Sequence, residues 1–315
     1  MRTYLLIVFF LLYSPWVSAT GSRLISSGGI TSFEGSSGGG ITPWALIAGY
    51  GAKEEVQGSG SLQLLDTGEY QLKTVGFAIG LYDRLELSYQ RQTLSVSSAV
   101  VGNVFNVLTS GTVDSAPGTD IEQDVVGLKL KLWGDAIFSE ETWAPQISLG
   151  IQYKQNLDFE TSLPLADGSV ALPDQGIPLL LGAKDDSGTD VYLSASKYLL
   201  GVAGGNNLLA NMTARWTKAN TFGLLGFSSN DDDDYSLEWE GSIVVALSPF
   251  TAVGAEWRTQ TDRLDGLAKE ETVNDVFIAY FPNKTLSLTA AYVDLGNLPF
   301  DDNASGFYLS VTVNL

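Results

Sequence analysis

Segments of about ten residues, in which apolar and polar side chains alternate, recur along most of this chain. In DVVGLKLKLW, residues 124–133, apolar side chains occupy every second position and Lys129 and Lys131 lie between them. A period of two places successive side chains on opposite faces of a β-strand. The same pattern occurs in residues 84–92, 146–154, 208–217, 237–247 and 306–315. The pattern predicts an all-β protein with many strands.

The connections between these segments alternate between short and long. Short turns are expected at residues 82–83, 248–250 and 282–284, with somewhat longer ones near 134–142 and 201–206. Long connections are expected near residues 95–121, 155–187, 218–234, 260–271 and 295–303. Strands of ~9 to 11 residues are long enough to cross a bilayer when tilted, and bacterial barrels have short turns at one end and long loops at the other. We therefore expect a single up-and-down antiparallel transmembrane β-barrel.

The number of strands depends on how the N-terminal region is interpreted. Counting back from the C-terminus gives segments down to residues 41–50, and because bacterial barrels use even numbers of strands, residues 23–33 are assigned as a further strand, for about 14 in total. The alternative is a barrel of 12 strands, with the Gly-rich N-terminus as a flexible lead or a plug in the lumen.

The first residues have the features of an export signal. Arg2 precedes an apolar stretch, and Val17-Ser18-Ala19 has the small residues of a cleavage site. We expect residues 1–19 to be a signal peptide and residues 20–315 to form the barrel in the outer membrane of a Gram-negative bacterium, with residues 20–40 as a candidate flexible lead. Aromatic residues beside the short turns are expected to form one interfacial girdle: Tyr82, Trp133, Trp143, Phe250 and Phe281.

Composition excludes several functions. The chain has no Cys and no His, and its formal net charge is -19. Disulfides, thiolate or imidazole metal sites and His-dependent catalysis are therefore absent, and the negative charge disfavours binding to nucleic acid. We expect no enzymatic activity and no cofactor.

Alternation also predicts which charged residues face the lumen. They are Glu86, Lys129, Lys131, Lys154, Arg215, Glu238, Glu240, Glu256 and Arg258. Acidic and basic groups are nearly balanced in this set, so a mixed, nearly neutral interior is expected, and the excess acid is assigned to the long connections.

The acidic connections contain weak candidates for divalent-cation binding. These are Asp185, Asp186 and Asp190, and the run Asp231, Asp232, Asp233 and Asp234. An EF-hand loop starting at Asn230 fails, because Tyr235 occupies the glycine position and Gly241 the final glutamate position. A solvated acidic rim, which attracts cations shared with lipopolysaccharide phosphates, is the hypothesis for these residues.

Several strings resemble a known family. GGGITPWALIAGYG, YDRLELSYQRQ, GAKDDSGTDVYL, TKANTFGLLGF, AVGAEWRT, AYFPNK and AYVDLGN are similar to an uncharacterised family of Gram-negative outer-membrane barrels filed as a domain of unknown function. The resemblance covers nearly all of the chain after residue 19. It implies an outer-membrane location and supplies no catalytic or binding residue.

The expected function is a passive channel or facilitator for small solutes with an acidic external rim. The alternatives are a structural or surface-interaction barrel with a closed lumen, whose acidic loops contact lipopolysaccharide through divalent cations, and a secreted soluble β-protein. The outer-membrane assembly machinery is expected to recognise the C-terminal strand, although Leu315 replaces the Phe or Trp that often ends such strands.

Overall fold

The computed structural model describes residues 29–51, 54–111, 115–137, 143–165, 170–172, 174–264 and 270–315. The expected signal peptide, residues 1–19, lies outside the described residues, as does the first part of the expected lead and of the expected strand at 23–33.

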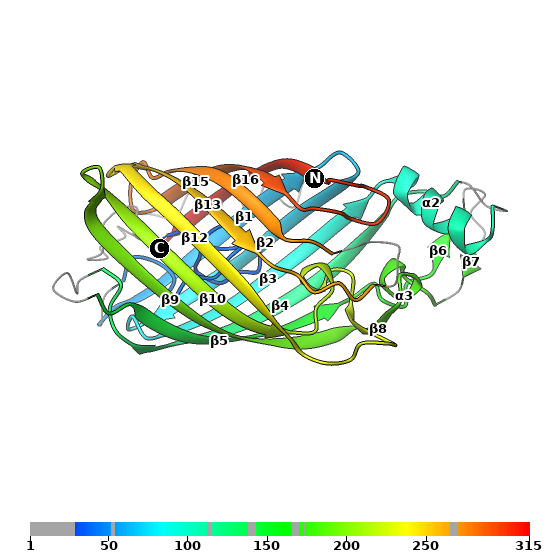
Figure 1. Ribbon diagram of the computed structural model, residues 1–315, viewed down its shortest axis with the longest axis horizontal. Helices are drawn as coiled ribbons and strands as arrows, with labels where there is room; N and C mark the ends of the chain where they lie inside the picture. Colours follow the sequence, from blue (N-terminus) through cyan, green and yellow to red (C-terminus); the bar gives the residue numbers. More distant parts are fainter. Residues whose placement is uncertain are drawn as a thin grey trace.

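Twelve antiparallel strands close into one barrel, in which each strand pairs with its neighbours along the chain and the first pairs with the last (Figure 1). The barrel strands are β1 (Val56–Asp66), β2 (Tyr70–Leu81), β3 (Leu85–Val96), β4 (Thr119–Trp133), β5 (Gln146–Asn156), β9 (Ser187–Ala203), β10 (Asn206–Thr217), β12 (Ser236–Ser248), β13 (Thr251–Arg258), β14 (Val273–Tyr280), β15 (Leu286–Asp294) and β16 (Ser305–Asn314). Closure leaves no unpaired sheet edge.

The expectation of about 14 strands is wrong, and the alternative of 12 with an N-terminal plug is confirmed. Neither residues 29–33 nor residues 41–50 belong to the barrel wall; both lie inside it. The error has a physical cause. In ITPWALIAGY the apolar residues Trp44, Leu46 and Ile47 are buried on every side, so the segment is apolar enough to resemble a strand without lining a membrane.

Short elements occupy the long connections at one end of the barrel, on the right in Figure 1. They are α2 (Ser98–Leu108), β6 (Leu163–Pro164), β7 (Val170–Leu172), α3 (Ile177–Leu180), β8 (Ala183–Asp185), η1 (Thr221–Gly223) and β11 (Phe227–Ser229). Helix α2 begins after Ser97, whose hydroxyl accepts a hydrogen bond from the amide of Val100. Within the described ranges, no helix has the length and apolar character needed to span a membrane. We call this the long-loop end, and the opposite end the short-turn end.

The two faces of the wall differ as the alternation predicts. Along β4, Leu128 and Leu130 are 43% and 37% exposed on the outside, whereas Lys129 between them is 1% exposed on the inside. The outer aromatic residues Tyr82, Trp133, Trp143 and Phe250 are exposed beside the short turns. The expectation that Phe281 belongs to the outer girdle is wrong, because Phe281 is 2% exposed. Alternation turns Tyr280 outward and therefore places Phe281 inside.

A plugged lumen as the candidate functional site

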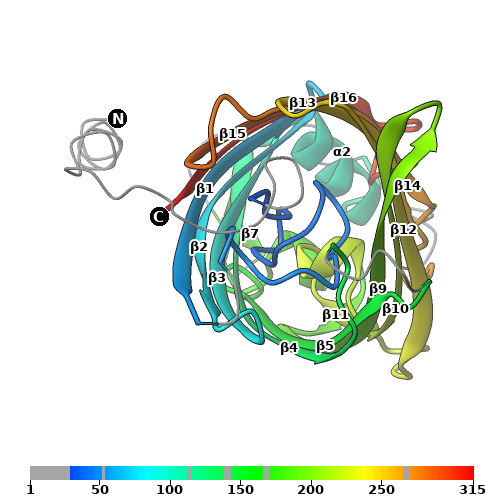
Figure 2. The ribbon, with the colours of Figure 1, turned by 90° about the vertical axis from the view of Figure 1, so that its left-hand side faces the viewer.

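Residues 29–51, which we call the N-terminal plug, fill the middle of the barrel. Figure 2 shows this segment, in dark blue, inside the ring of strands. Every residue of the plug is buried. Only isolated bridges, between Thr31 and Ser37 and between Gly38 and Pro43, give it regular pairing. Some of its backbone groups bond to each other, as the Phe33 amide does to the Gly40 carbonyl at 3.0 Å. Others need partners on the wall, since unpaired buried groups are costly.

Neutral polar side chains of the wall supply many of those partners. The carbonyl of Pro43 accepts hydrogen bonds from Thr213 Oγ1 at 2.9 Å and from Asn211 Nδ2 at 3.2 Å. The carbonyl of Ala45 accepts from Gln146 Nε2 at 2.6 Å, and its amide donates to Ser196 Oγ at 2.8 Å. The inward Ser, Thr, Asn and Gln residues thus serve as the pairing partners of the plug.

One buried ion pair holds the plug by its backbone at two places. Lys129 Nζ lies 3.1 Å from Glu86 and donates to the carbonyls of Ser37 and Leu46 at 2.9 and 3.0 Å. Glu86 in turn accepts from the amides of Ser37 at 3.1 Å and Ala48 at 2.8 Å. The lost hydration of Lys129 and Glu86 is therefore offset by their attraction to each other and by their hydrogen bonds to the plug. A buried ion pair needs such additional hydrogen bonds.

Glu256 binds the turn of the plug on the opposite wall. Its carboxylate accepts hydrogen bonds from the Ile41 amide at 2.9 Å, from the Thr42 hydroxyl, and from Ser242 at 2.6 Å. Trp44 Nε1 also donates to Ser242, at 2.9 Å. These contacts fix residues 41–44 against β12 and β13.

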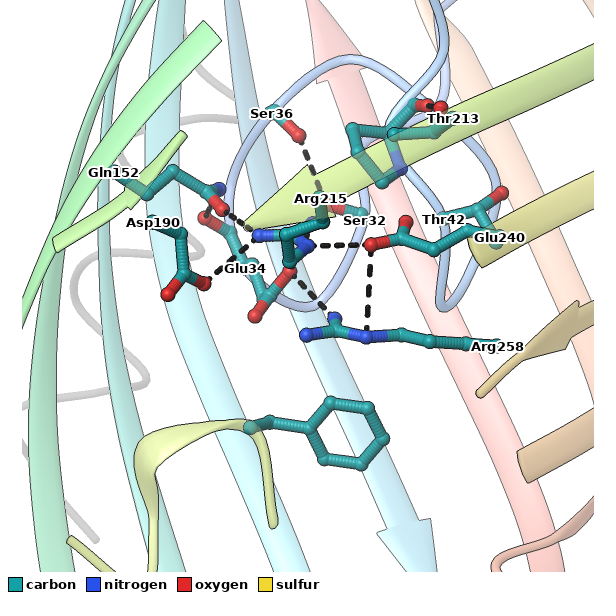
Figure 3. A network of polar contacts seen from close by, with 12 residues as sticks. Ser32, Glu34, Ser36, Thr42, Gln152, Asp190, Thr213, Arg215, Glu240 and Arg258 are labelled. Atoms are coloured by element: carbon teal, nitrogen blue, oxygen red, sulfur yellow. Dashed lines mark hydrogen bonds and ion pairs between the residues drawn. The ribbon is translucent and has the colours of Figure 1, made fainter. Parts of the chain in front are cut away.

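Glu34 brings the charges of three wall strands together (Figure 3). Its carboxylate lies 3.1 Å from Arg215 and 3.0 Å from Arg258, and it also pairs with Lys154. Burial alone raises the pKa of Glu34, but the charges of Arg215, Arg258 and Lys154 outweigh it and hold the pKa well below its usual range. Glu34 is therefore ionised in the closed lumen. Asp190 and Glu240 complete the cluster around Arg215.

A second segment enters the lumen from the long-loop end. Residues 218–229, which we call the inserted loop, carry Phe222 to the plug, where its ring packs edge-on against Phe33 at a centroid separation of 4.9 Å. Arg258 lies over the same ring at 4.6 Å, and Lys154 Nζ donates to the Phe222 carbonyl at 3.1 Å. Phe222 and the β-branched Thr221 both have positive φ, 64° and 42°, which costs free energy in such residues.

The predicted lumen-facing residues are mostly placed as expected. Glu86, Lys129, Lys154, Arg215, Glu238, Glu240, Glu256 and Arg258 are buried inside the barrel. Lys131 is less enclosed and pairs with Asp83 and Asp135 near the short-turn end. Several of these residues pair directly on the wall, as Arg215 does with Glu240. The plug residue Glu34 adds contacts between strands that alternation does not predict.

The expected near-neutral interior is wrong, because three acidic residues were missed. Glu34 lies in the plug, and Asp190 and Asp275 lie on the inner face of β9 and β14. In VNDVFIAY, Val273, Asp275 and Phe277 are all buried, so the alternation already indicated that Asp275 faces inward. No sequence pattern around Glu34 indicates that it lies in the lumen.

The candidate divalent-cation residues do not form a common site. The expectation that Asp190 belongs to an acidic outer rim is wrong, since Asp190 is buried and pairs with Lys154 and Arg215. Asp185 and Asp186 are exposed. Asp233 pairs with Lys184 and Lys218, and the hydrogen bond from Lys184 lowers its pKa. Across the described part of the chain, no group of three or more acidic side chains is arranged to hold a metal ion.

The contact between Gly39 and the wall gives a testable prediction. A Cβ at Gly39 would lie 1.8 Å from Glu256 Oε1, and Glu256 cannot move without losing its bonds to Ile41 and Thr42. We expect Gly39→Ala to destabilise the docked plug by about 1–3 kcal/mol, measured as faster amide hydrogen exchange in residues 29–51. Gly60→Ala is the control, because its Cβ would meet nothing closer than 4.0 Å. Equal protection in both variants would contradict this docking geometry.

Comparisons with known proteins identify a family but no characterised relative. A family model described as "Protein of unknown function (DUF3034)" matches residues 27–312. No curated protein matches the chain.

Solved structures with a similar fold include a NanC porin, which is 10% identical with a TM-score of 0.43, over 82% of this chain and 98% of that chain. The COG4313 outer membrane channel from Pseudomonas putida F1 is 14% identical with a TM-score of 0.43, over 87% of this chain and 96% of that chain. The outer membrane protein Omp33 of Acinetobacter baumannii is 10% identical with a TM-score of 0.35, over 83% of this chain and 98% of that chain.

Proposed function

The chain belongs to the DUF3034 family, and we propose that it is an outer-membrane facilitator for small solutes whose lumen is closed at rest by the N-terminal plug. The inserted loop closes the same lumen from the long-loop end. No residue has a catalytic role in this proposal.

The distribution of side chains supports a position in the membrane. The outer face of the wall carries exposed apolar residues on every strand pair, such as Leu87, Ile151, Ile243 and Val276. The inner face carries many buried polar and charged side chains beside apolar ones. In an outer-membrane barrel the short turns face the periplasm and the long loops face outward. In this orientation the inserted loop and the acidic connections lie on the external side.

The observation that carries the proposal is that a separate segment of chain closes the lumen. The wall contributes many polar and charged inward residues, and the plug docks onto them through hydrogen bonds and ion pairs. A lumen filled by its own wall side chains has no means of opening, whereas a docked segment can leave without unfolding the barrel. Export by a signal peptide and assembly through β16 are parts of the same proposal.

A second candidate is the structural barrel whose acidic loops contact lipopolysaccharide through divalent cations. The observation that favours it is the number of buried contacts that hold the plug, above all those of Glu34. In this case the plug would never leave the lumen.

Conductance in planar lipid bilayers tests the proposal. We expect the wild-type protein to give a closed baseline interrupted by brief openings, and a variant without the plug to give long openings. If neither protein conducts, although both insert, the facilitator is excluded and the structural barrel remains.

Closure by the inserted loop is expected to depend on pH through Glu270, which lies outside the barrel strands. Glu270 accepts hydrogen bonds from the amide and hydroxyl of Thr221. Burial raises the pKa of Glu270 to about 7, and the nearby charge of Glu238 adds to the effect. Because the closed state binds the proton more tightly than an exposed carboxyl does, closure is fully stabilised below the ordinary pKa and weakens as pH rises to about 7, by about 1.4 kcal/mol per pH unit.

The measurement is hydrogen exchange of residues 218–229, corrected for the intrinsic effect of pH. We expect the loop to be less protected at pH 8 than at pH 5, and Glu270→Gln to remove the difference. A pH dependence that survives in Glu270→Gln would assign it to another group.

A further inference from the structure

An apolar cavity lies in the long-loop half of the barrel, between the wall and both closing segments. The plug contributes Phe33 and Ile41, and the inserted loop contributes Phe222, Leu224 and Leu225. The wall and the β15–β16 connection contribute further apolar side chains, among them Leu65, Leu72, Leu94, Leu298 and Pro299. The centres of water-sized molecules can occupy about 60 Å³ among these residues, which is room for a few water molecules or for one small ligand in their place.

One polar group at the boundary of this cavity lacks a partner. Asp275 lines the cavity, its side chain is 5% exposed, and its Oδ1 atom has no hydrogen-bond partner among the described residues. A buried carboxyl oxygen without a partner is costly. A hydrogen-bond donor that a bound ligand brings to this carboxyl group would therefore be favoured.

The charges around Asp275 specify the kind of donor. Asp275 is aligned with Glu256 across β13 and β14, so its nearest charged neighbour on the sheet is also acidic. The four buried cations of the inner wall, Lys129, Lys154, Arg215 and Arg258, pair with other carboxylates. No described cation pairs with Asp275. The site therefore combines an apolar enclosure with an excess of negative charge.

We propose that this cavity binds a small apolar molecule carrying one protonated amine, with the ammonium group on Asp275 and the apolar body among Phe33, Leu72, Leu94 and Leu225. This assignment rests on the proposed function, because it names the class of solute that would enter the closed barrel from the external side. The bound molecule touches the plug and the inserted loop together. Its occupancy is therefore linked to the closure that both segments produce.

Binding is tested by isothermal titration calorimetry on the full-length protein in lipid nanodiscs. The probe is 2-phenylethylamine, compared with 2-phenylethanol and 3-phenylpropanoate, which keep the ring and change the polar group. We expect the amine to bind about tenfold or more tightly than the alcohol, because an ion pair in a largely apolar site is worth more than a neutral hydrogen bond. The carboxylate should not bind, because Asp275 would repel it.

Two variants separate the polar and apolar parts of the site. Asp275→Asn removes the charge at nearly constant shape, so the advantage of the amine over the alcohol should disappear while the alcohol still binds. Leu94→Trp fills the cavity and should abolish binding of both. Nanodisc samples of both variants are first checked for the heat-dependent gel shift of a folded barrel.

An amine that binds no more tightly than the alcohol, or an Asp275→Asn variant that keeps the preference, would overturn the assignment. A proton shared between Asp275 and Glu256 would produce that result. Calorimetry requires no conduction, so amine binding without conductance would reject only the facilitator, and conductance without amine preference would reject only this ligand class.

Discussion

Removal of residues 29–51, with residues 1–28 kept, is expected to give a barrel that conducts ions continuously in planar bilayers. The plug occupies the lumen, whereas the wall is closed by its own twelve-strand hydrogen bonding and keeps its outward apolar face. The pore should be narrow, because open aqueous channels are typical of 16 to 18 strands and Phe222 remains as a partial obstruction. Single-channel recordings measure the effect.

The pore should also select cations. After removal of the plug, the inner wall keeps Glu86, Asp190, Glu238, Glu240, Glu256 and Asp275 against Lys129, Lys154, Arg215 and Arg258. Acidic groups outnumber basic ones, and a lumen lined by excess negative charge concentrates cations. Reversal potentials in a salt gradient report this preference.

A reversible lock provides the matched control for the plug. The hydroxyl oxygens of Thr42 and Ser242 lie next to each other across the boundary between plug and wall, and the chain has no cysteine. Thr42→Cys combined with Ser242→Cys should therefore form one disulfide that keeps the lumen closed, and reduction should restore the brief openings of the wild type. A folded, inserted variant without residues 29–51 that fails to conduct would show that closure does not depend on the plug.

The barrel wall could be predicted from the sequence because its determinants are local. Alternation along β4 fixes that Leu128 faces out and Lys129 faces in, and the turns at residues 82–83 and 248–250 fix the order of the strands. The plug depends on contacts between residues far apart in sequence, such as Glu34 with Arg258. No local pattern distinguishes a Gly-rich lead outside the barrel from one docked inside it.

The acidic residues Asp275 and Glu34, which were not assigned to the lumen from the sequence, show how far a local pattern can predict the site. Asp275 follows the alternation of its strand and could have been assigned to the lumen by extending the pattern to β14. Glu34 could not, since its partners Lys154, Arg215 and Arg258 come from three strands. Conversely, the acidic run Asp231 to Asp234 is conspicuous in the sequence and suggests a cation site. In the structure Asp233 forms ion pairs with two lysines instead.

Glu34→Gln is expected to loosen the plug more than any other single substitution within it. The change leaves Lys154, Arg215 and Arg258 facing one another with one negative charge fewer, and breaking a buried ion pair costs about 3–5 kcal/mol. Hydrogen exchange of residues 29–51 should become about a hundredfold faster or more, since 1.4 kcal/mol corresponds to a factor of about ten. In bilayers the brief openings should become frequent.

The coupling between Glu34 and Arg258 identifies the cause of this effect. Arg258→Gln alone should also loosen the plug, but the double variant Glu34→Gln with Arg258→Gln should cost less than the sum of the two, because it removes both members of the pair. Glu54→Gln, at an exposed position just after the plug, is the control for charge loss and should leave exchange unchanged. Strictly additive costs would mean that Glu34 holds the plug through something other than its ion pairs.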